Sequence, residues 1–391
     1  MLTNALIYAL SGSFGLSVPL VGYRMLGLAG LLLVGVPVAT MVMWNRLPRR
    51  MWVRVSARAT MLLAAQLSAV LFAAVALNNW GLFYTSWGQL FGSQSGQIRI
   101  SAHGNARYGQ RALHVIDPSV ENQATSATKG LVESVMINGY RSGLIEPALV
   151  YLPPQYFQPR YAGARFPGVV VVSGYPGSLV AAVTRLGYPR TEQALLARKP
   201  IQPMVLVMMR SVVVGDRDTE CTDVPAGPQA LTFFTQDVPS AIDKAFHTAP
   251  DRWGAIGYST GGYCAVKFAM LQSSTFRAAV SLSGYYKSRH DVTTGDLWAG
   301  SPAVRDLNDL EWRLAHMPIP PISLMLTIGT QEHGPYGIPD TARFVRLAHA
   351  PMTVETVFEP GGVHTYSSWK KLLPRALRFL SARLWSPSLP G

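Results

Sequence analysis

The stretch "AIGYSTGGYCAVKFA" (residues 255–269) places Ser259 between two glycines, where an apolar run meets a run of helical character. Its core, "GYSTG", fits the pattern Gly-x-Ser-x-Gly, with Gly257 and Gly261 flanking the serine. Between a strand and a helix this pattern is typical of a sharp turn that lifts a nucleophilic hydroxyl clear of a sheet. The N-terminus of the following helix would favour developing negative charge there. The alternative interpretation is a plain glycine turn with a passive serine, so the rest of the chain must decide.

The chain from about residue 130 onward is predicted to form a mostly parallel sheet with flanking helices. Apolar runs of strand length alternate there with amphipathic segments, and the run "VVVV" at 169–172 is typical of a strand buried on both faces. The predicted strands are residues 131–138, 146–153, 167–174, 203–210, 252–259, 277–284, 322–329 and 353–360. Helices are predicted at 237–247, 262–272 and 366–385. The sequence thus predicts an α/β domain of about eight strands at 130–391, with a cap insert around 285–321.

A serine hydroxyl is a weak nucleophile alone and needs a base, which in turn needs an acid to orient it. In "EPGGVHTYSSW" (359–369), His364 stands in a glycine loop between the last predicted strand and the last predicted helix. This is the position expected for a catalytic base when the order along the chain is serine, acid, histidine. Other histidines after Ser259 lack such a setting: His316 and His349 are expected at the surface, and His290 lies in the cap.

The acid is expected after the predicted strand 322–329, where Glu332 and Asp340 are the candidates. Glu332 is preferred because it follows that strand by three residues, although a solvated loop acid is the alternative. An oxyanion site needs two backbone N–H groups. One would come from Thr260, directly after the serine, and the other from Tyr175 in the loop "SGYPGS" (173–178), unless that loop is only a turn.

The first 85 residues differ in composition from the rest of the chain. They hold six arginines and no Asp or Glu, within a chain whose formal net charge is +13. The uncharged runs 25–44 and 60–80 each have about the 20 residues that a helix needs to cross hydrocarbon. The uncharged stretch 2–23 is a third span, an interfacial helix or a weak signal peptide, with a span slightly favoured. We therefore predict a transmembrane anchor of two or three helices at 1–85, followed by a linker or membrane-proximal segment at 86–129.

Five of these arginines lie between the two apolar runs, in "NRLPRRMWVRVSARA" (45–59). Positive charge beside a span favours the cytoplasmic side, so the chain after Trp80 is expected outside the membrane. Cys221 and Cys264 would then lie where disulfides persist, and the sequence leaves their paired and unpaired states equally open. Nucleic-acid binding is disfavoured because no basic helix or aromatic-basic pattern occurs. The His and Cys spacings fit no zinc pattern, and no metal or organic cofactor is expected.

Seven segments occur in the same order as in the esterase-D-like and mycolyltransferase-like α/β-hydrolases, and the chain resembles that family over about residues 130–385. They are "VYLPPQYF", "VVVSGYPGS", "TFFTQDVPSAI", "GYSTGGYCAVKFA", "SLSGYY", "GDLWAGS" and "GGVHTYSSW". With "LNNWGLFYTSWGQLFG" after the apolar runs, the N-terminal part looks like that of actinobacterial membrane-anchored esterases. The resemblance implies an α/β-hydrolase fold and ester chemistry through an acyl-enzyme.

The resemblance also implies roles for individual residues. By position, Ser259 corresponds to the nucleophile, Glu332 to the acid, His364 to the base, and Tyr175 and Thr260 to the oxyanion positions. Two features of the match are looser. Esterase-D relatives use Asp and mycolyltransferases use Glu as the acid, and the usual His-Gly pair before the oxyanion loop is Ser173-Gly174 here.

Together these features predict a membrane-anchored, extracytoplasmic serine esterase or acyltransferase that acts on an ester, such as a cell-envelope lipid. Its expected partners are that substrate and the lipid bilayer. The competing hypothesis is a catalytically silent hydrolase fold that binds an envelope lipid or acts as a scaffold. A full set of serine, acid and histidine argues against it.

Overall fold

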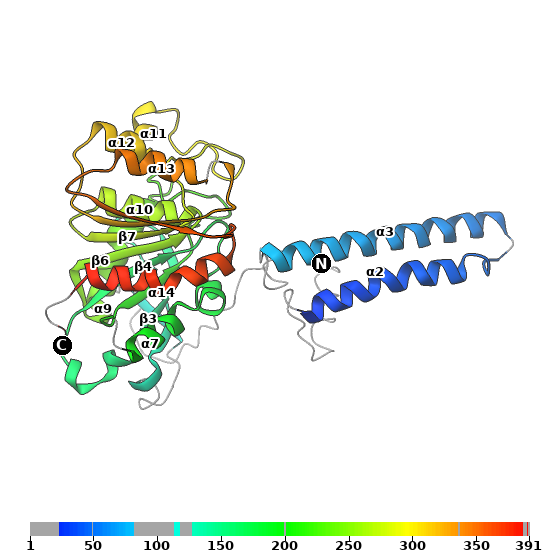
Figure 1. Ribbon diagram of the computed structural model, residues 1–391, viewed down its shortest axis with the longest axis horizontal. Helices are drawn as coiled ribbons and strands as arrows, with labels where there is room; N and C mark the ends of the chain where they lie inside the picture. Colours follow the sequence, from blue (N-terminus) through cyan, green and yellow to red (C-terminus); the bar gives the residue numbers. More distant parts are fainter. Residues whose placement is uncertain are drawn as a thin grey trace. The chain divides into compact units, whose positions relative to one another are not determined.

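The computed structural model describes residues 23–48, 50–81, 113–117, 127–198, 201–334, 337–385 and 389. The chain divides into two compact units, Met1–Gln97 and Ile98–Gly391 (Figure 1). Residues 2–22 of the uncharged stretch 2–23, the possible third span, lie outside the described residues. Most of the predicted linker at 86–129 lies outside them as well.

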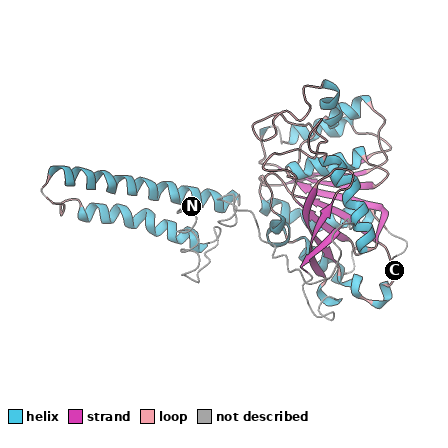
Figure 2. Cartoon of the chain, turned by 180° about the vertical axis from the view of Figure 1, so that it is seen from behind, coloured by secondary structure: helices cyan, strands magenta, loops and turns pink. Residues whose placement is uncertain are grey.

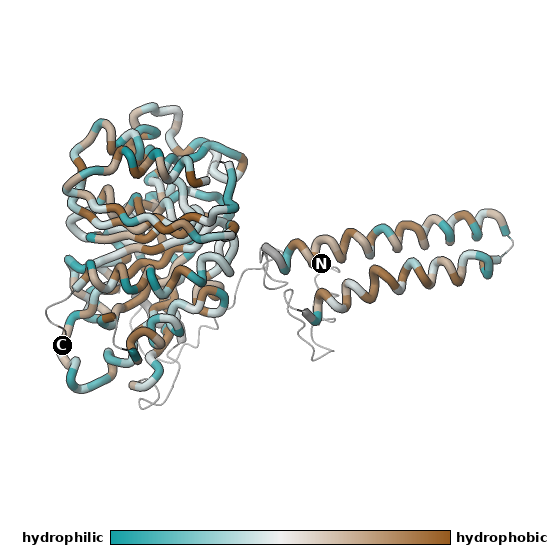
Figure 3. Tube along the Cα trace, viewed as in Figure 1, coloured by the Kyte–Doolittle hydropathy of each residue, from teal (hydrophilic) through white to brown (hydrophobic). Residues whose placement is uncertain are grey.

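The described part of the N-terminal unit holds an antiparallel pair of long helices, α2 (Tyr23–Met43) and α3 (Met51–Gly81), which pack against each other. Within them, Arg24–Met43 and Met51–Asn79 are long and apolar enough to cross a membrane. The two helices are largely brown, the colour of apolar residues, in Figure 3. Large apolar side chains point outward rather than into a core: Leu31 is 73% exposed and Met41 is 75% exposed. In a water-soluble protein, so much exposed apolar surface would be unfavourable.

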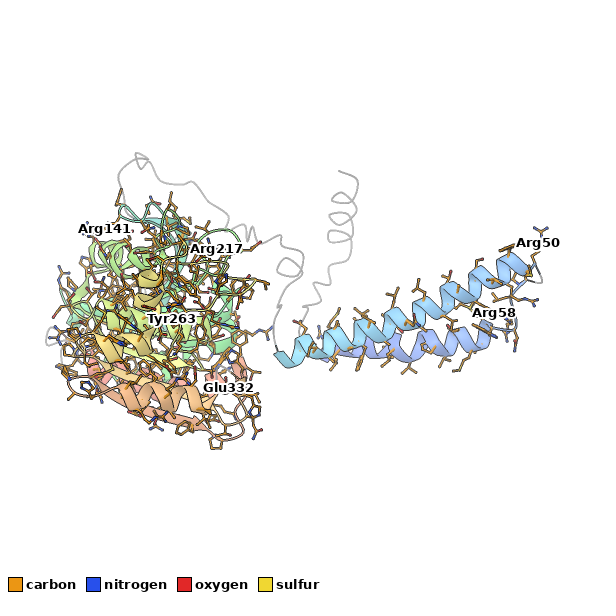
Figure 4. All side chains as sticks on the ribbon, turned by 90° about the horizontal axis from the view of Figure 1, so that it is seen from above. Arg50, Arg58, Arg141, Arg217, Tyr263 and Glu332 are labelled. Atoms are coloured by element: carbon orange, nitrogen blue, oxygen red, sulfur yellow. A yellow bond between two sulfur atoms is a disulfide. The ribbon has the colours of Figure 1, made fainter. Side chains whose placement is uncertain are left out.

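The connection between α2 and α3 carries positive charge. Arg50 and Arg58 lie near this end of the helix pair (Figure 4). The Arg58 guanidinium sits 4.6 Å from the centre of the Trp44 ring, which is a cation–π geometry. An aromatic ring and arginines at the end of an apolar helix pair are typical of a membrane–water boundary.

The second unit is built on one nine-stranded sheet, seen in magenta in Figure 2. The strands are β1 (Leu113–Asp117), β2 (Leu131–Asn138), β3 (Ile145–Leu152), β4 (Phe166–Val172), β5 (Val205–Met209), β6 (Thr248–Tyr258), β7 (Phe276–Leu282), β8 (Ser323–Gly329) and β9 (Thr353–Glu359). Their order across the sheet is β1-β2-β3-β5-β4-β6-β7-β8-β9. The β1–β2, β2–β3 and β3–β5 pairs are antiparallel, and all others are parallel.

The predicted α/β class with a mostly parallel sheet is confirmed. Each of the eight predicted strands is present, with ends shifted by a few residues. The ninth strand, β1, pairs with β2 from within the segment that the sequence predicted as a linker. Its five residues, "LHVID", are too few to stand out as a strand from the surrounding polar sequence.

Helices cover both faces of the sheet because the central strands are apolar on both sides. Along β4, Val170 and Val172 join one core cluster while Val169 and Val171 join the other, since successive side chains point to opposite faces. The first cluster lies under α9 (Val238–Phe246), α10 (Thr260–Leu271) and α13 (Ile338–Leu347), and the second under α7 (Tyr188–Ala197) and α14 (Tyr366–Arg383). The shorter elements are η1 (Pro154–Phe157), η2 (Pro159–Tyr161), α6 (Leu179–Ala181), η3 (Ala182–Leu186), α8 (Ala230–Thr232) and η4 (Phe233–Asp237).

The insert at 285–321 contains α11 (Pro302–Asn308) and α12 (Leu310–His316). In Figure 1 these two helices and α13 form a group beyond α10. Leu310 and Leu314 of α12 belong to the core cluster on the α10 side of the sheet. The earlier part of the insert contacts the loop after β5, where Arg217 donates hydrogen bonds to the carbonyl oxygens of Thr294 (2.7 Å) and Asp296 (2.6 Å).

Candidate active site

Ser259 stands at the turn between β6 and α10 in a backbone conformation that non-glycine residues rarely adopt. Its φ is 55° and its ψ is −126°. The flanking glycines are required sterically, because a Cβ on Gly257 would lie 2.1 Å from the Gly261 oxygen and one on Gly261 would lie 2.2 Å from the Val172 oxygen. The turn is held by the Ser259 N–H, which donates to the Leu282 oxygen at 2.9 Å. Strain of this kind is usually kept at functional sites.

A continuous chain of hydrogen bonds joins Ser259 to His364 and Glu332. The Ser259 Oγ lies 2.9 Å from His364 Nε2, and His364 Nδ1 lies 2.7 Å from Glu332 Oε2. Because a carboxylate only accepts, Nδ1–H donates to Glu332, which leaves Nε2 of the neutral ring to accept from the serine hydroxyl. The side chain of Glu332 is only 2% exposed, whereas that of His364 is 38% exposed. The structure therefore brings together the serine, the acid and the histidine that the sequence singled out.

Glu332 is held in place by contacts that the sequence did not indicate. Its Oε1 accepts hydrogen bonds from the Gly329 N–H (2.8 Å) and from the Ser283 hydroxyl (2.6 Å). Ser283 in turn accepts from Trp369 Nε1 at 2.9 Å, and the Trp369 ring meets the His364 ring edge to face at 5.0 Å. Ser283 follows β7 and is buried, with a φ of 53°. The signal in the sequence that could have indicated Ser283 is its place at the C-terminal end of the predicted strand 277–284, next to the strand that precedes Glu332.

Of the two predicted oxyanion residues, one follows the serine directly and the other belongs to a loop that passes beside it. Thr260 is the first residue of α10, where backbone N–H groups have no intrahelical acceptor. Tyr175 follows Gly174, and a Cβ on Gly174 would lie only 3.0 Å from Ser259 Cβ, so the loop after β4 passes directly beside the serine. The Tyr175 hydroxyl donates to the Asp216 oxygen at 2.8 Å and so ties this loop to the loop after β5.

The competing candidates have other partners. Asp340, the alternative acid, pairs with Arg343 within α13. His316 stacks on Trp312 and is exposed, and His349 is exposed with Nδ1 near the Ala350 oxygen. His290 is exposed in the insert and meets the Trp298 ring edge to face.

Cys221 and Cys264 form a disulfide, with an S–S distance of 2.13 Å and a Cα–Cα distance of 5.7 Å. It connects the loop after β5 to α10, one turn beyond the serine. Beside it, the Asp218 carboxylate accepts from the Thr260 hydroxyl at 3.2 Å and from the Glu220 N–H at 3.0 Å. These contacts fix the N-terminal turn of α10 from the side.

A buried polar cluster that the sequence did not indicate is built on Glu220 and Thr222, the two neighbours of Cys221 in the chain. Glu220 accepts hydrogen bonds from the Tyr285 hydroxyl (2.6 Å), the Ser288 hydroxyl (2.7 Å) and the Arg289 N–H (2.7 Å). Burial raises the pKa of Glu220 and lowers the pKa of the fully buried Lys267, whose Nζ donates to Thr222 Oγ1 at 2.8 Å.

Within the described ranges, no three His, Cys, Asp or Glu side chains gather as a metal site would need.

Comparison with known proteins places this geometry in a family. The sequence model for the family described as "Putative esterase" matches residues 147–380. Among curated protein sequences, none matches this chain.

Similar solved structures share the fold of the second unit. An S-formylglutathione hydrolase from Agrobacterium tumefaciens has a TM-score of 0.56 at 14% identity, covering 66% of this chain and 97% of its own. A ferulic acid esterase has a TM-score of 0.55 at 14% identity, covering 66% of this chain and 100% of its own. A fluorophosphonate-binding serine hydrolase, FphF from Staphylococcus aureus, has a TM-score of 0.50 at 18% identity, covering 64% of this chain and 98% of its own. The family match spans more than half of the chain, and the protein therefore belongs to this esterase family and is a carboxylic ester hydrolase with the α/β-hydrolase fold.

Proposed function

We propose that the protein is a membrane-anchored serine esterase in which Ser259 is the nucleophile, His364 the base and Glu332 the residue that orients it. The observation that carries this proposal is the chain of hydrogen bonds from Ser259 Oγ through His364 to Glu332 Oε2, at 2.9 and 2.7 Å. Distances of this size are within reach for proton transfer.

In the proposed reaction, Ser259 Oγ attacks the ester carbonyl carbon while its proton moves to His364 Nε2. The imidazolium that forms is stabilised by the buried Glu332 side chain, whose Oε2 accepts the hydrogen bond from His364 Nδ1–H. The carbonyl oxygen becomes an oxyanion between the backbone N–H groups of Thr260 and Tyr175. The C–O bond to the leaving alcohol then breaks, and His364 returns the proton to that alcohol, which leaves an acyl group on Ser259.

The second half of the reaction transfers the acyl group to an acceptor. Water can reach His364, since its side chain is 38% exposed, and we propose hydrolysis as the main outcome. A sugar or lipid hydroxyl that occupies the same position would make the protein an acyltransferase. Such an acceptor alcohol competes with water for activation by His364. An assay that contains the alcohol therefore distinguishes acyl transfer, which gives a new ester, from hydrolysis, which gives the free acid.

A fluorophosphonate probe is expected to label the purified full-length protein once, on the tryptic peptide that contains Ser259. Activated short-chain esters should protect against labelling, because they occupy the same nucleophile. Mass spectrometry identifies the modified residue, and product analysis with added sugar or lipid alcohols separates released acid from new ester. Folded protein that takes no label and turns over no ester would support the lipid-binding or scaffold alternative instead.

We propose that α2 and α3 anchor the enzyme in a lipid bilayer, as part of an anchor at 1–85. The helices span 21 and 31 residues, and the windows that could cross a membrane are only 6% and 11% buried. Exposed apolar side chains of this kind are more stable in the hydrocarbon of a bilayer than in water. The absence of Asp and Glu from residues 1–85 fits this placement.

We further propose that the catalytic unit lies on the outer side of the membrane. The arginine-rich connection between the helices favours the cytoplasm, which puts the chain after Trp80 outside. The disulfide between Cys221 and Cys264 supports the same side, because disulfides are rare in the reducing cytosol. An ester substrate in the cell envelope, such as a lipid, would be within reach there.

A reporter fused after Trp80 is therefore expected to be active only outside the membrane. Alkaline phosphatase, which needs an oxidising compartment, should give high activity in whole cells, and a cytoplasmic fluorescent reporter at the same junction should stay dark. The matched control places both reporters after Trp44, in the connection between the helices, where the pattern should reverse. High cytoplasmic signal at Trp80 would contradict the proposed orientation.

A further inference from the structure

Ser173, the residue directly after β4, is buried and fully engaged in hydrogen bonds beside the active site. It is 3% exposed. Its hydroxyl donates to the Gly174 oxygen at 2.9 Å and accepts from the Ser211 N–H at 3.3 Å. Its own N–H donates to the Met209 oxygen at 3.0 Å, which fixes its backbone to the end of β5. Ser173 is thus held from both sides.

The carbonyl that Ser173 contacts belongs to the same peptide group as the N–H of Tyr175. Among the described residues, the cis peptide bonds are Tyr175–Pro176 and Ala350–Pro351, so the Gly174–Tyr175 bond is trans. In a planar trans peptide the C=O and N–H point in opposite directions. A donor that fixes the direction of the Gly174 carbonyl therefore also fixes the direction of the Tyr175 N–H.

This peptide group lies next to the nucleophile. A Cβ on Gly174 would stand 3.0 Å from Ser259 Cβ and 3.1 Å from the Tyr258 oxygen. The loop also folds tightly over the Ser173 side chain, since a Cβ on Gly177 would lie 1.9 Å from its hydroxyl oxygen. The hydroxyl is therefore an internal support of the loop rather than a group facing substrate.

We propose that Ser173 is a positioning residue that holds the Gly174–Tyr175 peptide so that its N–H faces the developing oxyanion. This inference rests on the proposed function, in which Ser259 attacks an ester and Tyr175 contributes one oxyanion donor. The hydrogen bond at the carbonyl also polarises the peptide and strengthens its N–H as a donor. Ser173 therefore stabilises the transition state more than the bound ester, because the negative charge on the carbonyl oxygen is largest in the transition state.

Replacing Ser173 by alanine is expected to lower kcat for an activated ester by about 10- to 100-fold, because loss of an oxyanion donor outright costs about 10²- to 10³-fold. KM should change by less than about threefold, because the ground-state ester makes little use of this donor. A trifluoromethyl ketone, which forms a tetrahedral adduct with the serine, should bind more weakly by the same factor as kcat falls. Ser173→Cys, which nearly keeps the side-chain size but is a weak donor, should give an intermediate loss.

Ser211→Ala is the matched control, because it deletes one buried hydroxyl next to Ser173 that has no hydrogen-bond partner among the described residues. The hydrogen bond between the two residues runs from the Ser211 backbone N–H to the Ser173 hydroxyl, and alanine retains that N–H. This variant should keep kcat within about twofold, and circular dichroism should show the wild-type fold for all three proteins. An unchanged kcat in both Ser173 variants, or an equal loss in Ser211→Ala, would overturn the inference. Wild-type protein that takes no fluorophosphonate label would instead overturn the proposed function itself.

Discussion

Alanine at Ser259 or at His364 is expected to lower kcat for ester hydrolysis by about 10⁴- to 10⁶-fold, with little change in KM. Without Ser259 no acyl-enzyme can form. Without His364, the Ser259 hydroxyl loses the imidazole Nε2 that lies 2.9 Å away and would accept its proton. Initial rates on an activated ester, with each variant purified in the same detergent, measure the loss.

The double variant should be no worse than either single variant, because the two residues act as a unit and the remaining catalysis comes from the oxyanion site and binding. His349→Ala is the matched control, since this histidine is exposed and its Nδ1 lies 3.0 Å from the oxygen of the neighbouring Ala350 rather than near Ser259. It should keep wild-type rates. A His364→Ala enzyme that retained more than about a tenth of the wild-type kcat would remove His364 from the role of base.

The sheet could be predicted from the sequence because its central strands are continuous apolar runs. Burial of β4 on both faces leaves "VVVV" unbroken, and the predicted strand 167–174 overlaps the observed Phe166–Val172. The order of the predicted strands and motifs also predicts that Ser259, Glu332 and His364 lie close together. Each follows a strand, β6, β8 or β9, and parallel strands end at the same edge of the sheet.

The supporting contacts could not be predicted, because they join residues that are remote in the chain. Ser283 meets Glu332 across 49 residues and Trp369 across 86. Glu220 and Tyr285 meet across 65. A lone serine or glutamate has no periodicity that marks it, and its partner is set by how neighbouring strands and loops pack. The sequence therefore indicates which groups we propose to react, while the fold shows which residues hold those groups in place.

Replacing Glu332 by glutamine is expected to lower kcat by about 10⁴-fold while the protein stays folded. Glutamine keeps one oxygen that can accept from the Gly329 N–H and the Ser283 hydroxyl, so the loop after β8 retains these contacts. The other position, which faces His364 Nδ1 at 2.7 Å, becomes an NH₂ group that can only donate.

The imidazole must then turn Nδ1 into an acceptor and carry its proton on Nε2, which can no longer accept from Ser259. The defect therefore lies in the tautomer of His364 rather than in its position, and raising the pH should recover little activity. Asp340→Asn is the matched control, because this carboxylate pairs with Arg343 instead and was the competing candidate. Steady-state kinetics from pH 6 to 10 on both variants tests the argument. If Glu332→Gln were as active as Asp340→Asn, Glu332 would not be the orienting acid, and the hydrogen bond to His364 would be structural only.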